Sequence, residues 1–169
     1  MKDALEDFQN VLKRAEARLL ALSEDESEAR SAPGRWSSKE IIGHLIDSAS
    51  NNHQRFVRAQ FTDELVFPGY EQQDWVAVQH YQQESWPSLV KLWLLYNQHL
   101  LHLVSHIPEQ KLKQSRREHN LDRIAWQVVS KSELVTLEYF IRDYIEHLKH
   151  HLQQIFGGDE DARVSGERV

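Results

Sequence analysis

The sequence contains no cysteine in its 169 residues. Such a chain cannot form disulfides, bind zinc or iron–sulfur clusters through thiolates, or use a thiol of its own as a nucleophile. Any thiol chemistry would need a thiol that a small molecule brings to the protein. A cysteine-free chain also fits a reducing compartment, so we expect a cytoplasmic protein.

Long hydrophobic runs and an excess of positive charge are lacking as well. No apolar run approaches the roughly 20 residues of a membrane span, and the acidic N-terminus is unlike a signal peptide. The formal net charge of −6 provides no basic field that could attract phosphates. We therefore expect neither a membrane nor a nucleic-acid partner. The short basic patch of Lys111, Lys113, Arg116 and Arg117 is interpreted as a solvated connector.

Several catalytic signatures are missing. The chain has no glycine-rich phosphate loop, no G-x-S-x-G elbow and no H-E-x-x-H motif. The Glu-x-x-His pairs of di-iron bundles are missing too, because the acidic residues precede His44 and His147 by four positions rather than three. Nucleotide-binding, serine-hydrolase and zincin interpretations therefore lack their parts, and a mononuclear metal site is favoured over a di-iron site.

What the sequence does contain is helical periodicity. Apolar residues recur at alternating steps of three and four in four long segments, which is typical of amphipathic helices. The predicted helices cover residues 2–23, 37–61, 86–107 and 130–156. Capping-box patterns at Ser37-x-x-Glu40 and Ser130-x-x-Glu133 mark the starts of the second and the fourth. With no strand pattern, the sequence predicts an all-α protein with a four-helix bundle.

The connections divide the rest of the chain. We expect loops at 24–35, 62–69 and 109–121, a short helix within 70–80, and an extended or helical lead-in at 123–129. The last helix is predicted to turn Leu134, Leu137 and Ile141 inward and to end at Gly157-Gly158. We expect one bundle domain, residues 1–156, followed by a polar and disordered tail, residues 157–169.

The candidate site lies in a histidine cluster near the end of the last helix. Residues four apart lie one above the other on a helix, so His147 and His151 share one border of its apolar face. His150 points to solvent by the same angles and is excluded. His44 occupies a similar border of the second helix. Converging there, three neutral imidazoles would bind a first-row divalent metal and leave positions open for water or substrate.

Two other interpretations of the histidines stay open at this point. A histidine pair at this spacing is more often a pair of partly exposed border residues than a metal site. A rival set, His99, His102 and His106, shares one face of the third helix, but that face points mostly to solvent. Spacing alone does not choose between these interpretations.

The same borders carry further polar residues. Ser48, Asn51 and Arg55 follow His44 along the second helix, and Asn52 falls on its apolar face. A buried amide must be hydrogen-bonded, so Asn52 is predicted to cap a loop from inside or to line a cavity. Three nearby carboxylates are poorly placed as metal ligands by angle, although one of them could hold an imidazole N–H. These are Glu40, Asp47 and Asp143.

Two stretches carry a specific resemblance. The first stretch is Gly34-Arg35-Trp36-Ser37-Ser38-Lys39-Glu40-Ile41-Ile42-Gly43-His44-Leu45-Ile46-Asp47-Ser48, followed by Asn52 and Arg55-Phe56. The second is His147-x-x-x-His151-x-x-Gln154-Ile155. Together they resemble the DinB/YfiT-like family of metal-dependent enzymes, whose members are four-helix bundles and commonly dimers. The resemblance implies a metal held by His44, His147 and His151, and it suggests a homodimer.

The resemblance leaves the reaction open. It implies either hydrolysis of a small molecule or thiol transfer with a low-molecular-weight thiol, on a divalent metal such as Zn²⁺, Ni²⁺ or Fe²⁺. Asn52, Arg55, Trp75 and Tyr144 are the candidate substrate-binding residues. One alternative is a non-catalytic metal-binding or interaction bundle linked to stress. Another is a bundle that chiefly dimerises through exposed aromatic residues such as Trp93 and Trp126.

Overall fold

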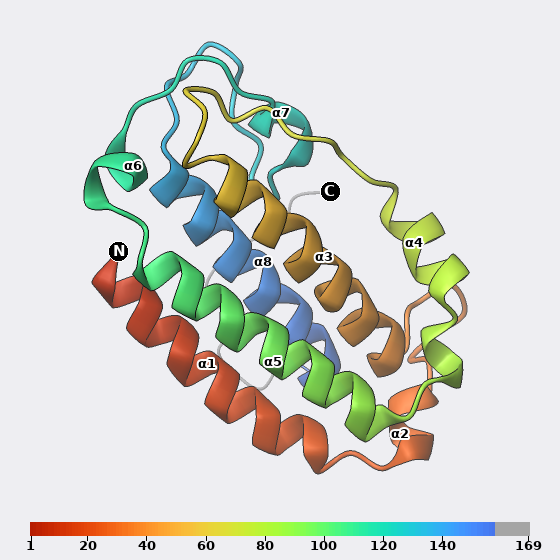
Figure 1. Cartoon of the computed structure of the whole chain (residues 1–169). Helices are drawn as coiled ribbons and strands as arrows, with labels where there is room; N and C mark the ends of the chain where they lie inside the picture. The colour runs from red at the N-terminus through yellow and green to blue at the C-terminus, as the bar shows by residue number, and fades with distance from the viewer. Residues whose placement is uncertain (158–169) are drawn as a thin grey trace.

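Four long helices form the bundle that the sequence predicts (Figure 1). The computed structural model describes residues 1–157. The long helices are α1 (Lys2–Leu20), α3 (Ser38–Arg58), α5 (Trp86–Ser105) and α8 (Leu137–Phe156). Helices α5 and α8 each pack against both α1 and α3, so the apolar stripes of all four helices meet in one core. None of the helices within residues 1–157 is both long enough and apolar enough to cross a lipid bilayer.

Short helices occupy the connections. They are α2 (Glu24–Glu28), α4 (Gln72–Gln79), the 3₁₀ helix η1 (Tyr81–Gln83), α6 (Glu109–Lys113) and α7 (Leu121–Ile124). The predicted loops at 24–35 and 109–121 were therefore wrong in part. Ser23 and Glu26 form a capping box at the start of α2, a local signal that the periodicity does not reveal because the helix has a single turn.

The start of α3 agrees with its sequence signal, whereas the start of α8 does not. The Ser37 hydroxyl accepts a hydrogen bond from the Glu40 N–H at 3.2 Å, and the Glu40 carboxylate accepts one from the Ser37 N–H at 2.9 Å. The cap of helix α8 lies six residues after the predicted cap at Ser130, because Thr136 is the residue whose side chain caps the helix. Val135 is held in extended conformation by a two-way backbone pairing with Arg116, which keeps the helix from starting earlier.

Three other predictions need correction. Leu134, expected inside, is 61% exposed because it precedes the helix. Arg116, expected in a solvated connector, is buried, and its guanidinium donates to the carbonyl of Ala59 at 3.0 Å. Trp93, which the dimerisation alternative took as exposed, is fully buried in the bundle core. Each error arises from packing between segments that are far apart in the sequence.

Helix α8 ends at Phe156, and Gly157 follows with a positive φ of 58°, a conformation that glycine adopts without strain. The predicted tail from residue 158 onward lies outside the described residues. The domain boundary near residue 156 stays a prediction.

Candidate functional site

The bundle brings three histidines together from two helices. His44 comes from the middle of α3, and His147 and His151 come from consecutive turns of α8. One ring nitrogen from each lies within 4.8 Å of the others. The Nε2 atoms of His44 and His147 are 3.2 Å apart. Within residues 1–157, this trio is the one group of three or more histidine and acidic side chains close enough to share a metal ion.

Burial keeps these imidazoles neutral. His44 is completely buried, and desolvation lowers its pKa to about 3, helped by the nearby His151. Desolvation, followed by repulsion from the neighbouring histidines, lowers the pKa of His147 to about 2. The pKa of His151 is lowered by burial as well. All three rings therefore carry a free lone pair at neutral pH, which is the form that binds metals.

A glutamine orients one of the rings. The Nδ1 atom of His151 lies 2.9 Å from the side-chain carbonyl oxygen of Gln154. Because that oxygen can only accept, Nδ1 carries the proton and the Nε2 lone pair is left for the cluster. The contact assigns a role to Gln154, which the sequence showed only as part of the resemblance.

None of the three carboxylates near the trio holds an imidazole. Glu40 caps α3 and pairs with Arg30. Asp47 accepts from Gln79 and from the hydroxyl of Tyr81. Asp143 accepts hydrogen bonds from the backbone N–H groups of residues 126 and 127, at 2.9 and 2.8 Å. The possibility that one of them orients a histidine is therefore not realised.

Two tryptophans flank the trio. The ring of Trp36 lies 5.2 Å from that of His44, and the ring of Trp126 lies 6.4 Å from that of His147. Trp126 also packs at 5.4 Å against His150. His150 is exposed and outside the cluster, as predicted, but it does border the adjoining pocket. Indole rings beside the trio limit its contact with bulk water.

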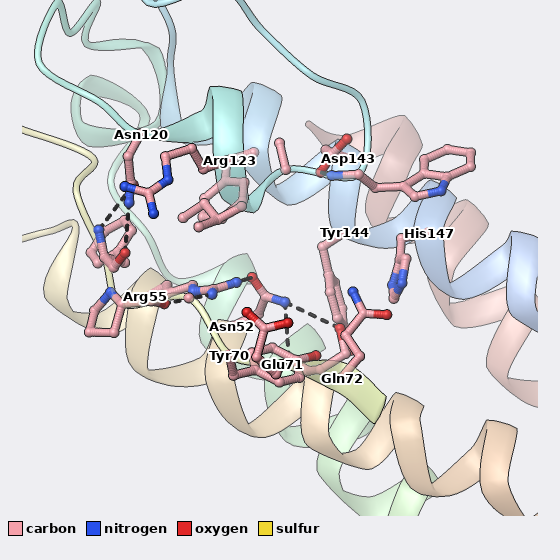
Figure 2. A pocket seen from close by; sticks show the side chains of 18 of the residues that line it. Asn52, Arg55, Tyr70, Glu71, Gln72, Asn120, Arg123, Asp143, Tyr144 and His147 are labelled. Atoms are coloured by element: carbon pink, nitrogen blue, oxygen red, sulfur yellow. Dashed lines mark hydrogen bonds between the residues drawn. The ribbon is translucent and has the colours of Figure 1, made fainter. Parts of the chain in front are cut away.

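His147 and His151 line a cavity of about 810 Å³, and His44 is buried against their rings. Figure 2 shows His147 at one end, Arg55 and Arg123 toward the other, and Tyr144 between them. Asn52 was predicted either to cap a loop from inside or to line a cavity, and it lines this cavity. Its amide donates to the Ser48 carbonyl at 2.9 Å. The Tyr144 hydroxyl already donates a hydrogen bond to the side-chain oxygen of Asn97 at 2.6 Å.

The structure does not place Trp75 in the cavity. Its ring packs at 4.8 Å against Tyr70, and Tyr70 lines the wall instead. The irregular segment 66–71 passes over the pocket and brings Tyr70 inward, whereas Trp75 lies beyond it on α4. Trp75 is not among the side chains that line the cavity, and its contact with a substrate stays a prediction.

Sequence reasoning missed the residues that the connections contribute to the wall. They come from segments 66–72 and 120–126, where no periodicity tells which side chains turn inward. The principal ones are Tyr70, Asn120, Arg123 and Trp126. A usable signal was Asn120, whose side chain pairs with the backbone of Phe67 in both directions, as an asparagine in a loop often does.

The rival histidine set does not form a site. His99 and His102 are exposed on α5, and His106 is the exposed residue directly after its end. The rings of His102 and His106 lie 4.4 Å apart, and His99 packs at 5.1 Å against His53 of α3. The three do not converge on a common point in the way that His44, His147 and His151 do.

Comparison with known proteins identifies the family. The model of the DinB superfamily matches residues 7–155, which is most of the chain. The chain belongs to the DinB superfamily. The match runs from α1 to α8 of this DinB-superfamily protein. It therefore includes the histidine trio, which lies on α3 and α8.

A solved structure supports the same fold. YfiT from Bacillus subtilis, described as a probable metal-dependent hydrolase with an unusual four-helix bundle topology, superposes with a TM-score of 0.71. The alignment covers 92% of this chain and 86% of YfiT at 18% sequence identity. At 18% identity, the superposition shows that this chain and YfiT share a fold. A search among curated proteins finds no significant match.

Proposed function

We propose that this protein is a metal-dependent enzyme that acts on a small molecule. The observation that carries the proposal is the convergence of three neutral imidazoles, those of His44, His147 and His151, the last two of which line one end of a cavity. Its volume of about 810 Å³ lies in the range of small-molecule sites. Membership of the superfamily and the description of YfiT support the same direction.

The donor set fits a first-row divalent metal. Two nitrogens that each lie about 2.0–2.1 Å from a tetrahedral zinc are separated by about 3.3 Å. The Nε2 atoms of His44 and His147 are 3.2 Å apart, close to that separation without any rearrangement. Three imidazoles suit Zn²⁺, Ni²⁺ or Fe²⁺ and leave coordination positions for other ligands, as catalytic sites do.

A metal held there would supply Lewis-acid chemistry, lowering the pKa of a water or thiol so that its anion exists at neutral pH. The residues of the chain prepare the surroundings. Gln154 orients His151, and Asp143 fixes the backbone of segment 126–127, which positions Trp126 beside the histidines. Asn52 and Arg55 present polar groups to a substrate in the cavity.

Two reactions share this site chemistry. Hydrolysis uses water as the nucleophile, and thiol transfer uses a low-molecular-weight thiol, since the chain itself has no cysteine. We favour hydrolysis because YfiT, which has the same fold, is described as a probable hydrolase. Thiol transfer to a small molecule is the second candidate, because three imidazole ligands leave a coordination position that a low-molecular-weight thiol could occupy.

Metal content tests the proposal directly. Protein purified without a nickel column should contain close to one metal ion per chain by elemental analysis. The variant His147→Ala should lose it, because two remaining imidazoles bind far more weakly. His102→Ala is the matched control and should keep the metal, since this exposed histidine of α5 lies outside the trio. A metal-free wild type, still metal-free after exposure to Zn²⁺, would contradict the proposal.

Cobalt substitution separates the reactions from a non-catalytic role. The visible spectrum of the Co²⁺ protein should change when a small thiol such as 2-mercaptoethanol is added if thiols reach the metal. Release of product from a chromogenic ester, lost in His147→Ala, would support hydrolysis. A spectrum that neither thiol nor pH alters, together with no turnover, would favour the non-catalytic metal-binding bundle.

A further inference from the structure

Arg55 is a buried cation without a counter-charge. Its side chain is 6% exposed although it borders the cavity. The Nη2 group donates to the carbonyl of Pro68 at 2.9 Å, and Nη1 donates to the amide oxygen of Asn52 at 3.4 Å. Both acceptors are neutral. Among the ion pairs formed within residues 1–157, none involves Arg55.

A charge in this position is costly for the folded protein. Burial lowers the pKa of Arg55, but a guanidinium remains protonated at neutral pH. Proteins normally pair a buried charge with one of opposite sign, because desolvation is otherwise uncompensated. Two neutral acceptors and the ring of Phe140, 5.9 Å away, offset only part of this cost. An anion entering the cavity would complete the pairing.

The other charged groups of the cavity do not neutralise Arg55. Asp143 lies with its carboxylate on the backbone N–H groups of residues 126 and 127. Glu71 is exposed on the segment that passes over the pocket. Arg123, also exposed, adds a second positive charge toward the same end as Arg55, away from His147 (Figure 2). The cavity therefore has a cationic end and a histidine end.

We propose that the cavity binds a small molecule bearing a carboxylate, with the carboxylate on Arg55 and the remainder extending toward His147. The subsite itself depends on Arg55 alone, whereas the assignment of this molecule as the substrate rests on the proposed metal-dependent function.

A carboxylate fits the subsite better than a phosphate. The single buried positive charge of Arg55 is balanced by one negative charge, and a planar guanidinium matches a planar carboxylate. A doubly charged phosphate would need a second buried cation, and Arg123 is exposed to solvent. Asn52, already oriented by Ser48, holds the guanidinium in place for the ligand.

Matched ligands test the subsite on the full chain. The binding of 3-phenylpropionate, its uncharged amide and phenylphosphonate would be measured by nuclear magnetic resonance titration. The titrations use the His147→Ala variant, in which the carboxylate cannot bind a metal at the trio. We expect 3-phenylpropionate to bind at least about tenfold more tightly than the amide, as a charge-assisted pair predicts. Equal binding of acid and amide, or tighter binding of the phosphonate, would overturn the proposal.

Variants then locate the charge. Arg55→Gln in the same background should weaken 3-phenylpropionate about tenfold and leave the amide unchanged. Arg58→Gln, one turn away on α3, exposed and outside the cavity wall, is the matched control and should change neither. If Arg55→Gln does not fold, Arg55→Lys keeps the charge but removes the planar fork and should weaken the acid by a smaller factor. Undiminished binding in the variant that folds would overturn the assignment.

The outcomes separate this inference from the metal proposal. Carboxylate binding that depends on Arg55, in a protein whose wild type never holds a metal, would support the subsite and contradict the proposed enzyme. A wild type that holds a metal, combined with carboxylate binding that Arg55→Gln does not weaken, would support the metal site and contradict the subsite.

Discussion

Gly43, the residue immediately before His44, lies against the ring of Tyr81. A Cβ atom at this position would come within 2.1 Å of a ring carbon of Tyr81. The ring cannot easily move away, because its hydroxyl donates to Asp47 at 2.8 Å. The absence of a side chain at Gly43 therefore fixes how η1 packs on α3 beside His44.

We predict that Gly43→Ala destabilises the protein by about 1–3 kcal/mol, the usual cost of overpacking. Urea unfolding followed by circular dichroism measures it. Gly69→Ala is the matched control, because the nearest atom to its added Cβ is 3.8 Å away, and it should shift stability by less than about 0.5 kcal/mol. Equal effects of the two substitutions would contradict the packing argument.

Asp47 gives a pH-dependent prediction. Its Oδ2 atom is buried without a hydrogen-bond partner, and desolvation raises its pKa above the usual 3.8, against the hydrogen bonds from Gln79 and Tyr81. A raised pKa in the folded state favours folding below pH 3.8, and this contribution is lost as the pH rises through the folded pKa. Asp47→Asn is neutral throughout and does not undergo that loss.

The free energy of unfolding of Asp47→Asn, relative to wild type, should therefore increase between pH 3.5 and pH 7, roughly. Urea titrations at intervals across this range measure the difference, with Asp74→Asn on the exposed face of α4 as the control substitution. A difference that falls as the pH rises would contradict the stated direction.

For single residues, the angular position on a helix predicted which side chains face the site better than adjacency in the sequence did. His147 and His151 were separated from His150 because each residue turns the helix by about 100°. Trp93 and Arg116 were misplaced for a different reason. Trp93 is an aromatic residue within an apolar face that was treated as exposed, and Arg116 lies in a connection where no period defines a direction.

Among the helices, the start of α8 shows how a local signal can mislead. Ser130 and Glu133 have the pattern of a capping box, and the Ser130 N–H does donate to Glu133 at 3.3 Å. That contact closes a turn, whereas the helix is capped by Thr136 and begins at Leu137. Pairing of Val135 with Arg116 could not be predicted, because it joins residues 19 positions apart across an irregular connection. The capping box of α3 has no such competitor.

We predict that Thr136→Ala destabilises the protein by about 1 kcal/mol, because the Thr136 hydroxyl accepts from the Tyr139 N–H at 3.1 Å. Ser130→Ala is the control and should cost less than about 0.5 kcal/mol, since Ser130 caps no helix. Thermal and urea unfolding of the two variants measure the difference. The reverse ranking would restore Ser130 as the start of the helix.

For the molecule as a whole, the long helices were predictable and the cavity wall was not. Helical periodicity defined the bundle core and the faces that carry the histidines. The wall depends on two irregular connections, which meet at the bridge between Leu65 and His119, and the second of them is also paired with itself at Arg116 and Val135. The homodimer and the cytoplasmic location stay predictions, and mass measurement in solution would test the former.

Arg116 links these connections to the bundle, since its guanidinium bonds to the carbonyls of Ala59, Lys111 and Gln114. Arg116→Ala should lower the free energy of unfolding by about 2 kcal/mol or more, because buried carbonyls lose their partner. Hydrogen exchange should also accelerate in residues 114–120. Arg117→Ala, exposed and adjacent, is the control and should be neutral. Unchanged exchange in Arg116→Ala would contradict the linking role.

We propose that His44, His147 and His151 together bind one metal ion. An anomalous difference map from crystals of Zn²⁺-treated protein, collected on both sides of the zinc absorption edge, tests it most directly. We expect one strong peak per chain, about 2.0–2.1 Å from a nitrogen of each of the three rings, and no peak in His147→Ala crystals. A map without density between the three rings, or with zinc only at His99, His102 and His106, would contradict it.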